Sequence, residues 1–314
     1  MNQRFAFFRE GGRAHDRGGS RSVATGRLSV YPMIYVIFLA NVFCGVLSGE
    51  ERPDASAISP VGKVEEVKTG FSFTEGPAWS ETGALFFTDI PNAKIHQFFS
   101  NRNSIETFTS QSGHANGVLI DASGRILVCQ MDGRVVEYDV ESAEYKTLAA
   151  SHDGKRFNAP NDLIIDKSGG IYFTDPLFRA PDPLPQGIQA VYYIPKDGPV
   201  KRMTGDIPAP NGIGLSPDGK RLYVIPSRQA EMLVYDVQGP GKIANGRTLC
   251  RLKQPPGKDN TGGDGMAEIA DQCAQKVEQD ARRGRHRVQM QLGTSRAAAR
   301  PWEQQQERQR QAAT

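Results

Sequence analysis

NGIGLSPDGKRLYVIP, from Asn211 to Pro226, sets the pattern from which the fold follows. A polar residue leads a short apolar strand, a turn containing Gly219 follows, and a second apolar strand completes a hairpin. The same template occurs three more times, as EGPAWSETGALFFTDI from Glu75, NGVLIDASGRILVCQM from Asn116 and NDLIIDKSGGIYFTDP from Asn161. A hairpin that recurs within one chain indicates a repeat architecture.

The repeat has the period of a β-propeller. Successive leading residues lie 41, 45 and 50 positions apart, and Asp264, 53 positions after Asn211, heads a fifth copy in DGMA. Further apolar strands follow the hairpins at KIHQFFS, GRVVEYDV, AVYYIPKDG and EMLVYDV. An all-β unit with several strands and a period in the forties is typical of propeller blades, which are four-stranded sheets around a central channel. A β-sandwich is the alternative, but it gives no reason for the recurrence.

The leading residues of the five copies all carry side-chain oxygen. They are Glu75, Asn116, Asn161, Asn211 and Asp264. Equivalent positions of successive blades lie on a ring at one end of the channel, so these side chains should converge. Oxygen-only donors with two carboxylates suit Ca²⁺, with Mg²⁺ and Mn²⁺ as alternatives, whereas Zn²⁺ prefers His or Cys.

Turn formation is the competing explanation for these polar pairs, since Asn-Gly and Asn-Asp commonly make turns. The glycines expected to form the turns, however, come later in each copy. They are Gly83, Gly124, Gly169 and Gly219. Position in the repeat therefore favours a metal site over turns.

Three further residues are candidates for the same cavity. His114 lies two residues before Asn116, and we expect it at the channel mouth in a catalytic role. Asp175 ends a strand in YFTDP, where it could point into the cavity or form a turn before proline. Arg156 in KRFNAPND could anchor a substrate oxygen or lie on the surface.

The motifs EGPAW, HANGV, FNAPNDLIID, YFTDP, PNGIGLSPDGKRLYV and GDGMA, in this order, resemble the gluconolactonase, senescence marker protein and luciferin-regenerating enzyme family. The resemblance covers about residues 61–267. It implies a six-bladed propeller with one divalent ion in its channel that hydrolyses lactones of sugar acids.

The resemblance also implies roles for single residues. Glu75, Asn211 and Asp264 match the metal ligands, and Asp264 also matches the general base. Asn161 matches a residue beside the metal that contacts substrate, so we count it with the ligands and, together with Asn116, with the substrate-binding residues. His114 and Asp175 resemble the channel-mouth histidine and its partner in paraoxonase-type propellers. The ion is expected to be Ca²⁺, with Mg²⁺, Mn²⁺ or Zn²⁺ as alternatives.

Two other functions stay open. A lactonase or esterase for a non-sugar substrate could use the same fold, and the Pro-rich loop 176–190, which would decide the substrate, indicates none. An inactive or purely binding propeller is the second. The expected partner is a small-molecule lactone substrate. The protein is expected to be a monomer.

The final segment, 268–314, breaks the pattern. It is rich in Gln and Arg, has Trp302 as its single aromatic residue, and shows no strand alternation. We expect a propeller of about four to four and a half blades over residues 61–267, followed by a non-homologous tail. A shift of reading frame near Ala267 explains the abrupt change better than a natural truncated relative.

The other end indicates export. Residues 28–49 carry no charge and follow an Arg-containing segment, so residues 1–48 are expected to be a signal peptide for a periplasmic or secreted protein, or else a membrane anchor, with a linker at 49–60. A net charge of +3, with six arginines before Leu28, provides no basic nucleic-acid face in the middle of the chain. Cys129 and Cys250 are too few there for a disulfide framework.

Overall fold

The computed structural model describes residues 3–8, 64–205, 207–254, 257 and 261–266. The chain divides into two compact units, residues 1–5 with 66–314 and residues 6–65. The fold described below belongs to the first unit. The apolar stretch 28–49, the linker 49–60 and the tail 268–314 lie outside the described residues. In the described ranges, no helix has the length and apolar character needed to cross a membrane.

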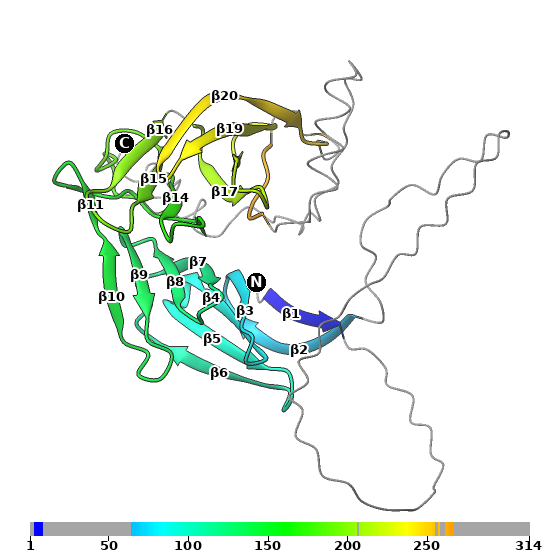
Figure 1. Cartoon of the computed structure of the whole chain (residues 1–314). Coiled ribbons are helices and arrows are strands. Elements are labelled where there is room, and N and C mark those ends of the chain that lie inside the picture. The colour runs from blue at the N-terminus through cyan, green and yellow to red at the C-terminus, as the bar shows by residue number, and fades with distance from the viewer. Residues whose placement is uncertain (1–2, 9–63, 206, 255–256, 258–260, 267–314) are drawn as a thin grey trace, which may run out of the picture. The chain divides into compact units, whose positions relative to one another are not determined.

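Four antiparallel sheets of four strands form the body of this unit (Figure 1). The first holds β3 (Thr74–Trp79), β4 (Ala84–Asp89), β5 (Lys94–Phe99) and β6 (Ser104–Thr109). The second holds β7 (Ala115–Ile120), β8 (Ile126–Gln130), β9 (Arg134–Tyr138) and β10 (Tyr145–Ala149). The third holds β13 (Leu163–Ile165), β14 (Ile171–Asp175), β15 (Ala190–Ile194) and β16 (Lys201–Gly205). The fourth holds β17 (Pro210–Leu215), β18 (Arg221–Pro226), β19 (Glu231–Gly239) and β20 (Lys242–Arg251).

The remaining elements lie outside the four sheets. They are β1 (Gln3–Phe8), β2 (Val64–Phe71), the pair β11 (Ser151–His152) and β12 (Lys155–Arg156), and a 3₁₀ turn at Ile90–Asn92. In each four-stranded sheet the strands pair in chain order, so each of the four complete copies of the sequence template forms one sheet. The predicted all-β repeat is confirmed. The fifth copy, in residues 261–266, forms no strand there.

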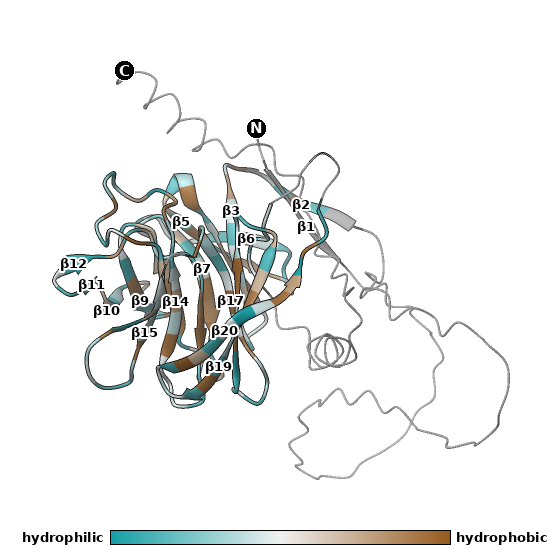
Figure 2. Ribbon diagram, turned by 90° about the horizontal axis from the view of Figure 1, so that it is seen from above, coloured by the Kyte–Doolittle hydropathy of each residue, from teal (hydrophilic) through white to brown (hydrophobic). Residues whose placement is uncertain are grey.

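The hydrophobic core lies between successive sheets. Strand β14 shows why, because its alternating side chains serve two cores: Phe173 packs in the cluster shared with the second sheet, and Tyr172 packs in the cluster shared with the fourth. A strand covered on both faces is buried along its whole length, and every residue of β4, β8 and β14 is buried, including the polar residues at the end of each strand. In Figure 2 the hydrophobic colour accordingly concentrates on the strands of the sheets.

The turn glycines behave as the sequence predicts. Gly83, Gly124, Gly169 and Gly219 have φ of +86°, +84°, +85° and +74°, a left-handed conformation that favours glycine. Each N–H donates to the carbonyl oxygen three residues earlier, at 2.7–3.0 Å. Since these glycines form the turns, the polar residues that lead each copy are free for another role.

Candidate active site

The leading residues of the five copies meet at one end of the innermost strands. Strand β3 contacts β7, β7 contacts β13, and β13 contacts β17, so the starts of these strands lie around a common axis. Two adjoining cavities occur here. The smaller is lined by Glu75, Asn116, Asn161 and Asp264, and the larger, of about 520 Å³, by Glu75, Asn116, Asn161 and Asn211. The predicted convergence of the five residues is therefore present.

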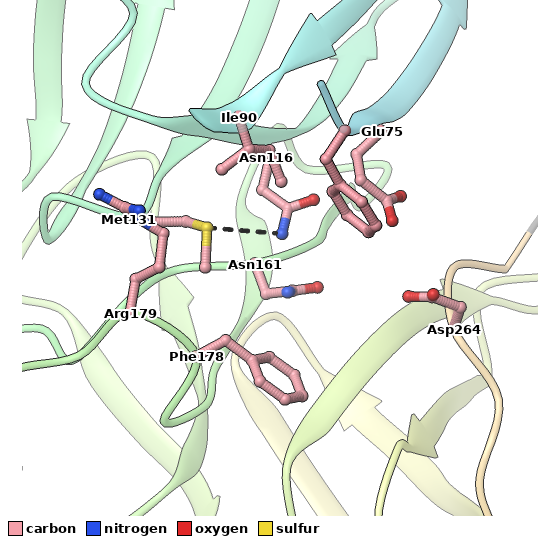
Figure 3. A pocket seen from close by; sticks show the side chains of 9 residues that line it. Glu75, Ile90, Asn116, Met131, Asn161, Phe178, Arg179 and Asp264 are labelled. Carbon is pink, nitrogen blue, oxygen red and sulfur yellow. Dashed lines mark hydrogen bonds between the residues drawn. The ribbon is translucent and has the colours of Figure 1, made fainter. Parts of the chain in front are cut away.

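Side-chain oxygens face the smaller cavity (Figure 3). The carboxylates of Glu75 and Asp264 and the amide of Asn161 point toward the same space. Asn161 and Asn211 are buried, whereas Asp264 is exposed. The remaining wall is largely apolar and is formed by Phe73, Ile90, Met131 and Phe178, with Arg179 beside them.

Threonine hydroxyls connect two of the five leading residues, called the ring residues below, to the preceding sheet by hydrogen bonds. Thr88 on β4 donates to the main-chain carbonyl of Asn116 at 3.1 Å, and Thr174 on β14 donates to that of Asn211 at 2.8 Å. Both threonines are buried. Because the bond is made at the carbonyl, the amide side chain is left to face the channel.

Main-chain N–H groups of glycines hold the other two ring residues for which such a hydrogen bond is present. The N–H of Gly117 donates to the carbonyl of Asn161 at 2.7 Å, and the N–H of Gly212 donates to that of Asp264 at 3.1 Å. A Cβ at Gly117 would lie 2.6 Å from that same Asn161 oxygen, and one at Gly76 would lie 2.1 Å from the Asn116 oxygen. Glycine follows the leading residue because neighbouring backbones approach too closely for a side chain.

Asn211 holds Asp264 directly. Its amide nitrogen donates to Oδ1 of Asp264 at 2.8 Å and to Oγ of Ser227 at 2.9 Å. The Ser227 hydroxyl in turn donates to the Gly263 carbonyl at 3.0 Å. The segment that carries Asp264 is thus fixed to the fourth sheet on both sides of the carboxylate.

Asp162 is a site residue that the sequence reasoning missed. The residue that follows the leading residue is glycine in four of the five copies and Asp162 in the third copy. This departure from the pattern is the signal that could have revealed it. Its side chain lines the larger cavity and accepts the N–H groups of Leu163 at 2.9 Å and Ile213 at 3.3 Å. Burial raises the pKa of Asp162 to about 7, and the charge of Asp264 adds to the rise.

Asp175 does not point into either cavity, contrary to the expectation. It is buried, and its two oxygens accept the N–H groups of Asn158 at 2.9 Å and Ala159 at 2.8 Å. Burial raises the pKa of Asp175 to about 7. Asp89, at the equivalent place in the first sheet, accepts main-chain N–H groups in the same way. This carboxylate shapes the segments that enter the first and the third sheets.

Arg156 is also elsewhere than expected. Its guanidinium donates to the main-chain carbonyls of Phe157 at 2.9 Å and Asn158 at 3.1 Å, and the residue is exposed. His114 pairs through Nδ1 with Oδ1 of Asp132 at 2.9 Å, with φ of +53°. Neither residue lines the two cavities. A catalytic role for His114 stays a prediction of the sequence.

The donor set fits a hard divalent cation. In the described ranges, no group of three or more His, Cys, Asp or Glu side chains is placed to hold a metal ion, so amide oxygens must complete any site. Carboxylate and amide oxygens are the ligands that Ca²⁺ takes in proteins. Glu75 and Asp264 would supply the charge, with Asn161 and Asn211 as neutral donors. The Asn211 amide would turn about its terminal torsion to present its oxygen.

Comparison with known proteins identifies the family of the chain. The sequence model of the family described as SMP-30/Gluconolactonase/LRE-like region matches residues 73–275. A gluconolactonase from Zymomonas mobilis is 29% identical over 209 residues, which are 60% of this chain and 58% of that relative. The chain thus spans less than two thirds of the length of that relative.

Solved structures share the fold. A gluconolactonase from Xanthomonas campestris superposes with a TM-score of 0.56 at 27% identity, covering 62% of this chain and 66% of its own. A calcium-binding regucalcin from Agrobacterium tumefaciens superposes with a TM-score of 0.51 at 18% identity, covering 62% and 63%. With the family model matching about two thirds of its length, the chain belongs to the SMP-30/gluconolactonase/LRE-like family.

Proposed function

We propose that the protein hydrolyses the lactone of a sugar acid. The observation that carries this proposal is the convergence of Glu75, Asn161 and Asp264, from separate parts of the repeat, on one cavity. The adjoining cavity of about 520 Å³ falls within the size range of small-molecule sites. The gluconolactonases among the relatives support lactones of sugar acids as the substrate class.

Glu75, Asn161, Asn211 and Asp264 would hold one divalent cation, with Ca²⁺ favoured by the all-oxygen donor set. When bound, such a cation polarises a carbonyl group and stabilises the negative charge that develops on its oxygen. The calcium-binding regucalcin that shares the fold supports this choice of ion.

Asp264 is positioned to take the proton of the attacking water. In the structure the Asn211 amide holds one carboxylate oxygen of Asp264 at 2.8 Å; once Asn211 turned its oxygen toward a cation, the cation itself would hold this carboxylate. Gly212 holds the main chain of Asp264 from the adjacent strand. The main chain that carries the base is therefore fixed before substrate binds, although the residue is exposed.

The ring amides are suited to align substrate hydroxyls. The amide nitrogen of Asn116 lies 3.8 Å from the sulfur of Met131, which is a weak acceptor. A sugar hydroxyl is a stronger acceptor and would replace this contact at little cost. Asn161, whose carbonyl is held by Gly117, presents its amide from the neighbouring position.

Purified full-length protein should open glucono-1,5-lactone in pH-stat measurements, lose this activity with a calcium chelator and regain it with added Ca²⁺. Asp264→Asn should reduce kcat by at least about a hundredfold, because a positioned general base contributes a factor of about 10²–10⁴. The exposed Asp197 offers a matched control, and Asp197→Asn should keep wild-type activity. Chelator-insensitive hydrolysis, or full activity in Asp264→Asn, would overturn the mechanism.

The choice of substrate is tested separately. Hydrolysis of an aliphatic lactone with no turnover of glucono-1,5-lactone would assign the same machinery to a non-sugar substrate. Failure to hydrolyse either in the presence of bound Ca²⁺ would identify the protein as a binding propeller.

A further inference from the structure

Arg179 is the one cationic side chain that lines the smaller cavity. It comes from the loop between β14 and β15, and in Figure 3 it lies on the side opposite Asp264, with its guanidinium beside Met131 and directed away from the carboxylates. Phe178, Met131 and Ile90 form the apolar wall next to it. The carboxylates therefore face the cavity from one side, and Arg179 places a guanidinium at its opposite edge.

The loop that carries Arg179 is anchored on several sides. The N–H of Leu177 donates to the side chain of Gln189 at 3.1 Å, and the amide of Asn158 donates to the carbonyl of Ile188 at 2.9 Å. Arg179 itself has φ of +57°, in the left-handed region that non-glycine residues seldom adopt. A strained residue persists only where its surroundings fix it, so the position of Arg179 is built into the loop.

Gln186 strengthens this anchoring. Its side-chain nitrogen donates to the carbonyls of Lys155 at 2.7 Å and Arg156 at 3.1 Å, and its oxygen accepts the hydroxyl of Tyr192 at 3.2 Å. Its own N–H donates to the side chain of Asn158 at 3.1 Å. The loop is thus held at its middle as well as at its ends.

The Arg179 guanidinium has unused hydrogen-bonding capacity. Its Nε is buried and makes no hydrogen bond. Within the described part of the chain, no ion pair to Arg179 is present among the salt bridges of the structure. A guanidinium stays charged at any pH at which a protein is folded, and a buried donor without a partner costs free energy. An anionic ligand group would satisfy both the charge and the Nε–H.

We infer that Arg179 makes the site selective for lactones that carry a second, anionic group, a carboxylate or a phosphate, away from the lactone ring. Arginine binds both groups through paired N–H donors. A hydroxyl of a neutral sugar lactone can accept a hydrogen bond from the guanidinium but leaves its charge unpaired, whereas a carboxylate or phosphate satisfies both. This inference rests on the proposed lactone hydrolysis and narrows its substrate class.

Binding of reaction products tests the inference without requiring turnover. Isothermal titration of the full-length protein with gluconate and with glucarate compares one carboxylate with two on otherwise similar chains. We expect wild-type protein to bind glucarate at least about tenfold more tightly, as a charge-assisted hydrogen bond would give. Arg179→Gln should remove this preference and Arg179→Lys should retain part of it. Arg102→Gln, a substitution of an exposed arginine paired with Glu106, should leave it unchanged.

Turnover adds a second readout. The ratio of kcat/KM for glucaro-1,4-lactone, or for 6-phosphoglucono-1,5-lactone, to that for glucono-1,5-lactone should fall at least about tenfold in Arg179→Gln. The carboxylate and phosphate arms identify which anion is preferred. Equal binding of gluconate and glucarate by wild-type protein would overturn the inference, and this result does not depend on the stability of Arg179→Gln. A glucarate preference that survives Arg179→Gln would also overturn it. A glucarate preference without hydrolysis of any lactone would refute the proposed function and leave the anion site standing.

Discussion

Replacing Gly76 by alanine tests whether close approach of neighbouring sheets sets the ring. A Cβ at Gly76 would lie 2.1 Å from the carbonyl oxygen of Asn116 and 3.0 Å from the nitrogen of Val118, where ordinary contact begins at 3.4 Å. Strands β3 and β7 would have to separate by about 1 Å to admit the methyl group. Gly83 is the matched control, because it also has positive φ but nothing lies within 4 Å of its Cβ position.

The two substitutions share one cost and differ in another. A non-glycine residue in the left-handed region costs roughly 1–2 kcal/mol, which applies to Gly76→Ala and to Gly83→Ala. Overpacking adds about 1–3 kcal/mol at Gly76 alone. We expect the midpoint of thermal unfolding of Gly76→Ala to lie roughly 2–12 °C below that of Gly83→Ala.

The assay is thermal unfolding followed by circular dichroism, with urea unfolding as an independent measure. Lactone hydrolysis provides a second readout, because Glu75 precedes Gly76 and would move with it. Misplacement by about 1 Å can cost a factor of about 10² in rate, so Gly76→Ala should lose activity and Gly83→Ala should keep it. Equal unfolding midpoints for the two variants would refute the close-approach argument.

Three further perturbations follow from the same contacts. Thr174→Val removes the donor to the Asn211 carbonyl and should lower the free energy of unfolding by about 1–3 kcal/mol in urea titrations, whereas the exposed Thr147→Val should change it by less than about 0.5 kcal/mol. Burial raises the pKa of Asp175 to about 7, so between about pH 4 and 7 the folded protein keeps a proton that the unfolded chain releases. The free energy of unfolding should therefore fall as pH rises through this window. Asp175→Asn should reduce the slope of unfolding free energy against pH, and an unchanged slope would contradict this assignment. Added Ca²⁺ at about a hundred times its Kd should stabilise the wild type by about 2.7 kcal/mol, seen as a higher unfolding midpoint, and Asp264→Asn should show no such shift.

The repeat and its ring could be predicted from the sequence because both are local patterns. The turn at Gly219 and the strand that follows it are set by neighbouring residues, and a fixed period then places Asn211 and Asp264 at equivalent points. The symmetry of a radial repeat then brings these residues together, since equivalent positions lie at one end of the channel.

Most of the side chains whose positions the sequence did not predict lie in the loops between sheets or bond to them. Asp175 caps main-chain N–H groups 16 and 17 residues earlier, and Arg156 donates to carbonyls whose positions depend on the path of that same loop. Arg179 belongs to a long Pro-rich loop whose anchoring by Gln186 has no local sequence signal. Asp162 differed, because it interrupted the glycine pattern and could have been recognised.

The ties between sheets have a consequence for how such a site can change over evolutionary time. Four of the five leading residues are held through their main-chain carbonyls by a residue of the preceding sheet or strand, namely Thr88, Gly117, Thr174 or Gly212. The identity of each side chain is therefore nearly independent of its location. Mutation can exchange asparagine, aspartate, glutamate or histidine at the rim one position at a time, and so recruit a different ion or reaction, while the scaffold that aims these groups is inherited intact.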